Sequence, residues 1–165
     1  MGGVLPSSRT LAKRVSDAVN ELLSDPQTPL IEIGPGTGAL TRELVRLPNP
    51  LVLLERESDF AQELLVRFPK ARVICDDFLS IPSFSMGSRG AVVISSLPIR
   101  SLPHPELFQA RFRELLLSGA VQAVVQFSYG WRDPLDLKDS RVRATRRYFV
   151  PFNIPPAFVW VYRLN

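Results

Sequence analysis

Three glycines alternate with other residues in the stretch EIGPGTG, at positions 32–38. Gly34, Gly36 and Gly38 follow the apolar run LIEI and precede a segment with helical periodicity. Glycine lets the backbone approach a ligand closely, and the first turn of a helix offers unpaired N–H groups. The stretch therefore predicts a turn between a strand and a helix that binds a nucleotide or nucleoside.

Acidic residues end the next two apolar runs. Glu55 ends LVLLE, about 20 residues after the first glycine, where a carboxylate can accept hydrogen bonds from both hydroxyls of a ribose. Asp76 and Asp77 follow ARVIC, where a carboxylate can accept from an adenine amino group, and Phe78 can pack on the ring. The alternative for the two aspartates is a loop start or a helix cap.

The glycine pattern also fits the loose dinucleotide motif, with Ala39 in the third small position. Glu32 favours a different cofactor, because an acid two residues before the first glycine suits a cationic end better than an anionic pyrophosphate. The strict alternation of the glycines and the acidic pair Asp76 and Asp77 point the same way. We therefore predict S-adenosyl-L-methionine as the cofactor and no metal.

The elements that position these residues follow from the spacing of apolar residues. We expect helices at 7–23, 37–47, 58–68 and 104–119, with Ser7 or Ser8 as the first N-cap, and strands at 30–34, 51–55, 71–75, 91–95, 121–129 and 158–164. Because strands and helices alternate, the sequence predicts an α/β fold with parallel strands. The last two strands have no helix between them, so we expect an antiparallel hairpin around a basic, proline-rich excursion at 130–156.

The composition is that of one globular domain, because the chain has 165 residues, of which 45% are hydrophobic and 22% charged. We expect a single domain at 1–165, with an N-terminal helix and cap at 1–28 and the core at 29–165. No apolar run reaches the length of a membrane span, and the N-terminus has no signal-peptide pattern. Cys75 is the only cysteine, which favours a reducing cytoplasm, and we expect it to be buried. The net charge of +4 suggests an anionic partner.

EIGPGTG, Glu55 and CDDF together resemble the three motifs of class I S-adenosylmethionine-dependent methyltransferases. The resemblance covers the chain from residue 30 to its end. It implies a Rossmann-like three-layer sandwich whose mostly parallel, seven-stranded sheet has an antiparallel last strand. It also implies further cofactor contacts from Thr37, Arg56 and Ser95.

The stretch ISSLPIRSLP faces the transferable methyl group in such folds. The ribosomal RNA adenine dimethyltransferases carry Asn-Leu-Pro and an aromatic residue here, which hold the adenine amine and stack on the flipped base. In this chain Ser96 replaces the asparagine and Ile99 replaces the aromatic residue. Without this stacking surface the loop loses its main contact with a flipped base, so we expect that nucleic acid is not the partner.

Five segments in order, GGVLPSSRTLA, EIGPGTGALTREL, SSLPIRSLP, VVQFSYG and NIPPAFVWVYR, resemble the bacterial phospholipid N-methyltransferases. The resemblance implies methylation of an aminophospholipid such as phosphatidylethanolamine, by a cytoplasmic enzyme that docks peripherally at the inner face of the membrane. It implies that Ser95, Ser96, Leu97 and Pro98 line the methyl site and that Tyr129 lies near the headgroup. The alternatives are a methyltransferase for ribosomal RNA adenine or another small amine, and a cofactor-binding module without turnover.

Other polar and aromatic residues allow two interpretations each. Tyr129 either orients the acceptor amine or packs on the sheet as a strand-end aromatic residue. His104, the only histidine, is either a base beside the methyl site or a surface residue that caps a helix. Four arginines in the excursion suit a phosphodiester or a membrane surface, or form a solvated loop; they are Arg141, Arg143, Arg146 and Arg147.

Overall fold

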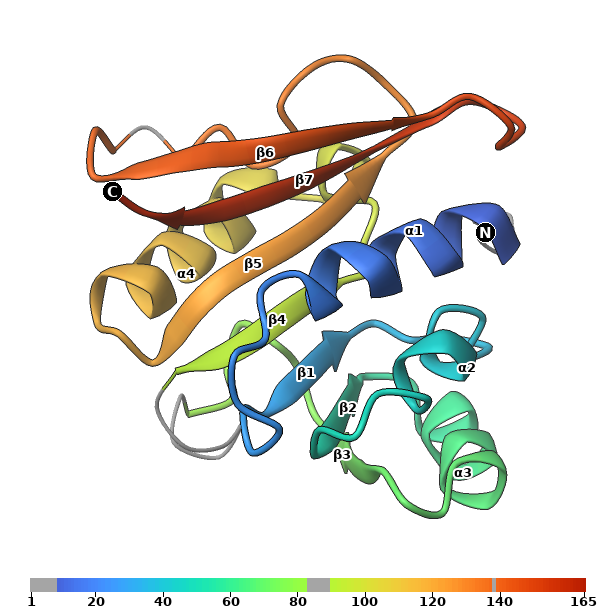
Figure 1. The fold of residues 1–165 in the computed structure, drawn as a ribbon. Coiled ribbons are helices and arrows are strands. Elements are labelled where there is room, and N and C mark those ends of the chain that lie inside the picture. The colour runs from blue at the N-terminus through green and yellow to red at the C-terminus, as the bar shows by residue number, and fades with distance from the viewer. Residues whose placement is uncertain (1–8, 83–89, 138) are drawn as a thin grey trace.

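The structure, a computed structural model, describes residues 9–82, 90–137 and 139–165. Figure 1 shows a twisted sheet with helices on both of its faces. The strands are β1 (Leu30–Ile33), β2 (Leu51–Glu55), β3 (Arg72–Cys75), β4 (Ala91–Ser95), β5 (Val121–Ser128), β6 (Val142–Val150) and β7 (Ala157–Leu164). The helices are α1 (Arg9–Asn20), α2 (Thr41–Leu44), α3 (Ser58–Arg67), α4 (Pro105–Leu117) and the 3-10 helix η2 (Ile99–Ser101).

The sheet has the order β3-β2-β1-β4-β5-β7-β6. Strands β1 to β5 are paired in parallel, whereas β7 runs antiparallel to both β5 and β6. The chain order reverses at β1, which pairs with β2 on one side and β4 on the other. In open α/β sheets, ligands bind beyond the carboxyl ends of the strands at such a reversal. The topology therefore directs attention to the segments that follow β1, β2 and β4.

Each face of the sheet carries its own apolar layer. Helix α1 buries Leu11, Val15 and Val19 on one face, and α4 buries Phe112 and Leu115 on the other. Every residue of β1, β2 and β4 is buried. A parallel strand covered on both faces has no solvent side, which explains why these strands read as continuous apolar runs.

The expected fold class is confirmed: an α/β sandwich with a mostly parallel, seven-stranded sheet. The antiparallel pairing of the fifth apolar run with the last strand is also confirmed. The helix expected at 37–47 is shorter, because only Thr41–Leu44 are α-helical and the glycine turn occupies the preceding residues. The proposed caps Ser7 and Ser8 lie outside the described residues, and the boundary at residue 28 stays a prediction.

Two expectations about the sheet were wrong. Strand β6 lies inside the segment that we interpreted as an excursion. It is an edge strand with five exposed residues in a row, so its sequence lacks the alternation that marks a half-buried strand. Cys75 was expected to be buried but is exposed, because it ends β3 at the opposite edge of the sheet. Among the helices of the described ranges, none is long and apolar enough to cross a bilayer.

Candidate functional site

The glycine turn after β1 brings two distant segments close to the backbone. Gly34 has φ +67°, and a Cβ there would lie 2.4 Å from Leu97 Cδ2 in the loop after β4. Gly38 has φ +72°, and a Cβ there would lie 2.6 Å from the ring of Phe68. Both positions combine a left-handed backbone with no room for a side chain, so only glycine fits without strain.

Glu55 fixes the same turn from the end of β2. Its carboxylate accepts a hydrogen bond of 2.9 Å from the Gly36 N–H and one of 3.0 Å from the Glu57 N–H. The side chain is buried, yet it lines a pocket at the carboxyl ends of the strands. Each carboxylate oxygen has a second lone pair, so Glu55 can hold the turn and still accept from a ligand.

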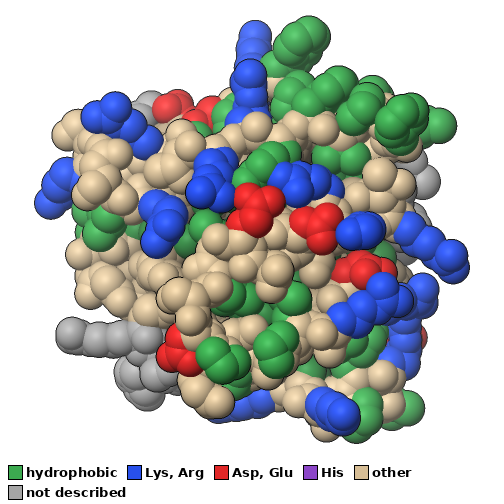
Figure 2. Space-filling model, in the orientation of Figure 1, with side chains coloured by type: hydrophobic (Ala, Val, Ile, Leu, Met, Phe, Trp, Pro, Cys, Tyr) green, Lys and Arg blue, Asp and Glu red, His purple; other side chains and the backbone are tan. Residues whose placement is uncertain are grey.

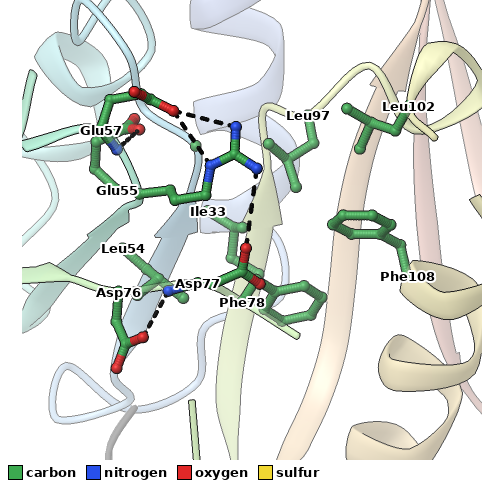
Figure 3. A pocket seen from close by; sticks show the side chains of 12 residues that line it. Ile33, Leu54, Glu55, Glu57, Asp76, Asp77, Phe78, Leu97, Leu102 and Phe108 are labelled. Carbon is green, nitrogen blue, oxygen red and sulfur yellow. Dashed lines mark hydrogen bonds and ion pairs between the residues drawn. The ribbon is translucent and has the colours of Figure 1, made fainter. Parts of the chain in front are cut away.

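The pocket beside Glu55 has an acidic side and an apolar side (Figure 3). Phe78 forms part of the apolar side and packs on the ring of Phe112, with 4.7 Å between centroids. The predicted methyl-site residue Leu97 also lines this pocket. Sequence reasoning missed the other apolar lining residues, which come from four separate segments: Ile33, Leu54, Leu102 and Phe108. Residues so far apart in the sequence give no shared local signal.

Asp76 and Asp77 lie on the acidic side of this pocket. Asp77 Oδ1 also accepts a hydrogen bond of 2.7 Å from the Leu79 N–H, so it closes the turn after β3 as well. Arg56 also lines the pocket, and its guanidinium lies 3.1 Å from Glu57 and 4.0 Å from the second oxygen of Asp77. Asp77 therefore both caps the turn after β3 and lines the pocket, so the two interpretations of this residue do not exclude each other.

Glu32 lies in β1 and lines neither pocket at the strand ends. Its carboxylate is fully buried and accepts hydrogen bonds of 2.6 Å from the Thr41 hydroxyl and 3.2 Å from the Ser96 hydroxyl. Burial raises the pKa of Glu32 to about 7, although both hydrogen bonds act to lower it. Five expected cofactor contacts do not line either of the two pockets at the strand ends: Glu32, Gly36, Thr37, Gly38 and Ser95.

A second pocket, of about 370 Å³, lies beyond the ends of β4 and β5. This volume is within the range of small-molecule sites, about 300–1,000 Å³. The predicted methyl-site residues Ser96, Leu97, Pro98 and Tyr129 line it, whereas Ser95 is buried beneath. Leu97 lines both pockets, so a single side chain lies between them. Arg100 and Arg132 are the only charged residues in its lining as far as the described chain shows.

Gln126 is a lining residue of this second pocket that sequence reasoning missed. Its amide nitrogen donates hydrogen bonds of 3.0 Å to the Leu97 carbonyl and 2.8 Å to the Phe127 carbonyl. Its buried oxygen, Oε1, has no hydrogen-bond partner. Buried amide oxygens are usually paired, and leaving one unpaired costs about 1–3 kcal/mol. Gln126 therefore holds a buried acceptor without a protein partner in the wall of this pocket.

The loop after β5 carries two exposed rings into the second pocket, Tyr129 and Trp131. Two hydrogen bonds connect this region to β7: Trp160 Nε1 donates to the Oγ of Ser128, the last residue of β5, at 2.9 Å, and the buried Tyr162 hydroxyl donates to Asp133 in the loop. Sequence reasoning missed Trp131, because the residues next to it in the sequence form no motif that indicates a binding site.

The remaining candidates lie outside the pockets. His104 is exposed at the start of α4 and contacts Glu106 at 3.2 Å. Arg141 is ion-paired with Asp139 at 2.9 Å, and Arg146 is paired at 2.9 Å with Glu21, which directly follows α1. The four arginines therefore do not act as one cluster, and they lie on a strand or at its start instead of in a solvated loop.

Comparison with known proteins matches residues 7–100, more than half of the chain, to the family described as ribosomal RNA adenine dimethylase. Ribosomal RNA small subunit methyltransferase A of Chlorobium chlorochromatii (strain CaD3) is 35% identical over 85 residues, which cover 50% of this chain and 32% of that protein. The protein of the same name from Chlorobium phaeobacteroides (strain DSM 266 / SMG 266 / 2430) is 28% identical over 117 residues, 70% of this chain and 42% of that protein. The chain thus spans well under half the length of these relatives.

Solved structures share the fold at low sequence identity. The 23S rRNA methyltransferase ErmE has a TM-score of 0.64 at 18% identity and covers 96% of this chain and 68% of its own. The N-methyltransferase NodS from Bradyrhizobium japonicum WM9 has a TM-score of 0.72 at 12% identity and covers 97% of this chain and 99% of its own. These likenesses confirm the expected Rossmann-like methyltransferase fold.

The comparisons correct the expected partners. An aminophospholipid acceptor and the exclusion of nucleic acid were wrong, because the matching family and relatives are ribosomal RNA methyltransferases. The two substitutions that led to this expectation, Ser96 and Ile99, lie in one loop, whereas the match to the family spans residues 7–100. The expected membrane location depended on that acceptor and loses its basis with it.

Proposed function

Because the chain belongs to the ribosomal RNA adenine dimethylase family, we propose that it is a methyltransferase that acts on the exocyclic amine of adenine in RNA. The predicted cofactor, S-adenosyl-L-methionine, agrees with this family. One observation supports the activity above all others: Leu97 lines both the pocket beside Glu55 and the pocket beside Gln126. Ligands that fill the two pockets are therefore neighbours at Leu97, and a group transfer requires such proximity.

The pocket beside Glu55 suits the cofactor by its chemistry. Glu55 supplies carboxylate oxygens for ribose hydroxyls, and Asp77 supplies one for an adenine amino group. Phe78 and Phe108 offer ring surfaces for a flat base. When bound, S-adenosylmethionine supplies an electrophilic methyl group.

The pocket beside Gln126 suits an adenine amine. For methylation, the nitrogen must face the methyl group, and one N–H proton must leave. Gln126 Oε1 is a buried acceptor without a partner, and it can take a hydrogen bond from this amine and orient it. In the family, an asparagine of the loop after β4 does this; here Ser96 stands at that position and its hydroxyl donates to Glu32. We therefore assign the role of the missing amide to Gln126.

The second departure from the family concerns stacking. Ile99 stands where the family has an aromatic residue, and it is buried with 2% exposed. Tyr129 and Trp131 line the same pocket and are 39% and 81% exposed. These rings supply a stacking surface from the loop after β5 in place of the one lost at Ile99.

The test is methyl transfer from labelled S-adenosylmethionine to unmethylated ribosomal RNA, followed by digestion and mass analysis of the nucleosides. We expect methylated adenosine in the digest. A Glu55→Ala variant serves as the cofactor-deficient control. Absence of label from the RNA, with label in another amine supplied in parallel, would contradict an RNA acceptor.

A further inference from the structure

Three aromatic rings form a row that leads away from the pocket beside Gln126. The ring of Trp131 lies 6.3 Å from that of Phe158, at 29° between planes, and Phe158 lies 5.0 Å from Phe149, at 32°. The row, Trp131–Phe158–Phe149, crosses from the loop after β5 over β7 to β6. Trp131 belongs both to the row and to the pocket lining, so the two features are continuous.

The ends of the row are open to solvent. Trp131 is 81% exposed and Phe149 is 57% exposed, although each is large and apolar. The row lies on the face of β6 and β7 that is opposite to α1, because Phe158 packs with the apolar layer of α4. Figure 2 shows the other face, which carries α1, with hydrophobic side chains at the top of the molecule and Lys and Arg side chains nearby. Exposed rings that no core requires mark a surface for a partner.

Arg147 gives the row a positive charge. Its guanidinium lies 5.4 Å from the ring centre of Phe158 and 5.2 Å from that of Trp160. Arg100 and Arg132 line the adjoining pocket, in which the described residues include no acid. Rings interleaved with cations and free of acids suit a partner that has both flat bases and phosphates.

The neighbouring residues on β6 face the other way. Arg146 and Tyr148 both donate hydrogen bonds to Glu21, which directly follows α1, at 2.9 and 2.6 Å. Alternation along the strand therefore separates a structural face, with Arg146 and Tyr148, from the face that carries Arg147 and Phe149. This separation supplies matched arginine variants.

We propose that the row Trp131–Phe158–Phe149, flanked by Arg147, binds single-stranded RNA by stacking on nucleotides next to the methylated base. This inference rests on the proposed function, because it places the target base in the pocket beside Gln126. Base-on-ring stacking contributes roughly 1–3 kcal/mol per base and does not depend on sequence. Paired bases cannot stack on the row, so duplex RNA gains nothing from it.

The test measures the affinity of a short, labelled, adenine-containing oligoribonucleotide by fluorescence anisotropy, single-stranded and as a duplex. We expect Trp131→Ala and Phe149→Ala each to weaken single-strand binding about tenfold and to leave duplex binding unchanged. Arg147→Ala weakens binding of both the single strand and the duplex and makes the affinity less dependent on salt concentration. Arg146→Ala changes the single-strand affinity less than twofold. Phe152→Ala, an exposed phenylalanine outside the row, is the matched aromatic control. Thermal unfolding checks that each variant is folded.

Equal single-strand affinity of Phe149→Ala, Trp131→Ala and the unchanged protein would overturn the proposal. So would an equal loss in Phe152→Ala, or binding of anionic vesicles through these residues with no affinity for RNA. The outcomes also separate the two proposals. If the unchanged protein methylates RNA but the row variants bind it normally, only the row fails. If the row governs RNA binding but no methyl group enters RNA, only the proposed function fails.

Discussion

The hydroxyl of Ser96 donates a 3.2 Å hydrogen bond to the buried carboxylate of Glu32, although the two residues lie 64 positions apart. Glu32 belongs to β1, directly before the glycine turn, and Ser96 opens the loop that lines the pocket beside Gln126. The same carboxylate accepts from Thr41 at 2.6 Å. One buried acid of β1 is thus hydrogen-bonded both to α2 and to the loop after β4.

Glu32→Gln should change how stability depends on pH. Burial raises the pKa of Glu32 from 4.5 to about 7, so between these values the folded protein holds a proton that the unfolded chain has lost. The free energy of unfolding therefore falls as pH rises through this window, by up to about 3 kcal/mol. Urea unfolding at pH 5 and pH 8 should show that the variant gains stability relative to the unchanged protein at the higher pH. Glu63→Gln, at an exposed site, is the control. A difference between Glu32→Gln and the unchanged protein that stays constant with pH would contradict the prediction.

Glu55→Ala should weaken cofactor binding at least tenfold. The substitution removes the carboxylate that we assign to the ribose and also the acceptor for the Gly36 and Glu57 N–H groups. Calorimetry with S-adenosylhomocysteine, the stable product, measures the effect, and Glu63→Ala on α3 provides a carboxylate control. Unchanged affinity in Glu55→Ala would remove the ribose assignment while leaving the fold intact.

Gly34→Ala should lower the free energy of unfolding by more than the left-handed backbone angle alone would cause. Gly34 and Gly119 have nearly equal φ, +67° and +71°, but a Cβ at Gly119 meets open space, whereas one at Gly34 would lie 2.4 Å from Leu97. Gly119→Ala therefore isolates the cost of a left-handed backbone, about 1–2 kcal/mol. We expect Gly34→Ala to lose more than this in urea unfolding and to lose cofactor affinity. Equal losses in the two variants would show that the contact with Leu97 relaxes freely.

Gln126→Leu should slow methyl transfer about tenfold without weakening cofactor binding, because one hydrogen bond of roughly 1.4 kcal/mol corresponds to that factor. The variant removes Oε1, the unpaired buried oxygen of the acceptor pocket. Gln122→Leu, at the other end of β5, is the matched control. Single-turnover rates and calorimetry with S-adenosylhomocysteine separate the two effects. A normal transfer rate in Gln126→Leu would exclude Gln126 as the group that orients the amine.

Some of this molecule could be predicted from the sequence because the relevant constraints are local. Strands β1, β2 and β4 are buried on both faces, so their sequences are continuously apolar and easily recognised. The EIGPGTG turn is equally local, because the left-handed backbone at Gly34 and Gly38 selects glycine. Glu55 follows from its place at the end of a recognisable strand. The fold class and the location of the pocket beside Glu55 are consequences of these features.

Other features depend on contacts between distant segments, which no local pattern records. Strand β6 is recognisable only by its pairing with β7, because its exposed, basic residues resemble a loop. The unpaired oxygen of Gln126 depends on where the loop after β4 places the Leu97 carbonyl. The row Trp131–Phe158–Phe149 joins three segments across the sheet edge. The sequence alone determined the buried strands and the glycine turn, since burial and backbone angles act within one segment. Only the tertiary structure decided the pocket beside Gln126 and the aromatic row, since hydrogen bonds and ring contacts there join residues that the chain brings together by folding.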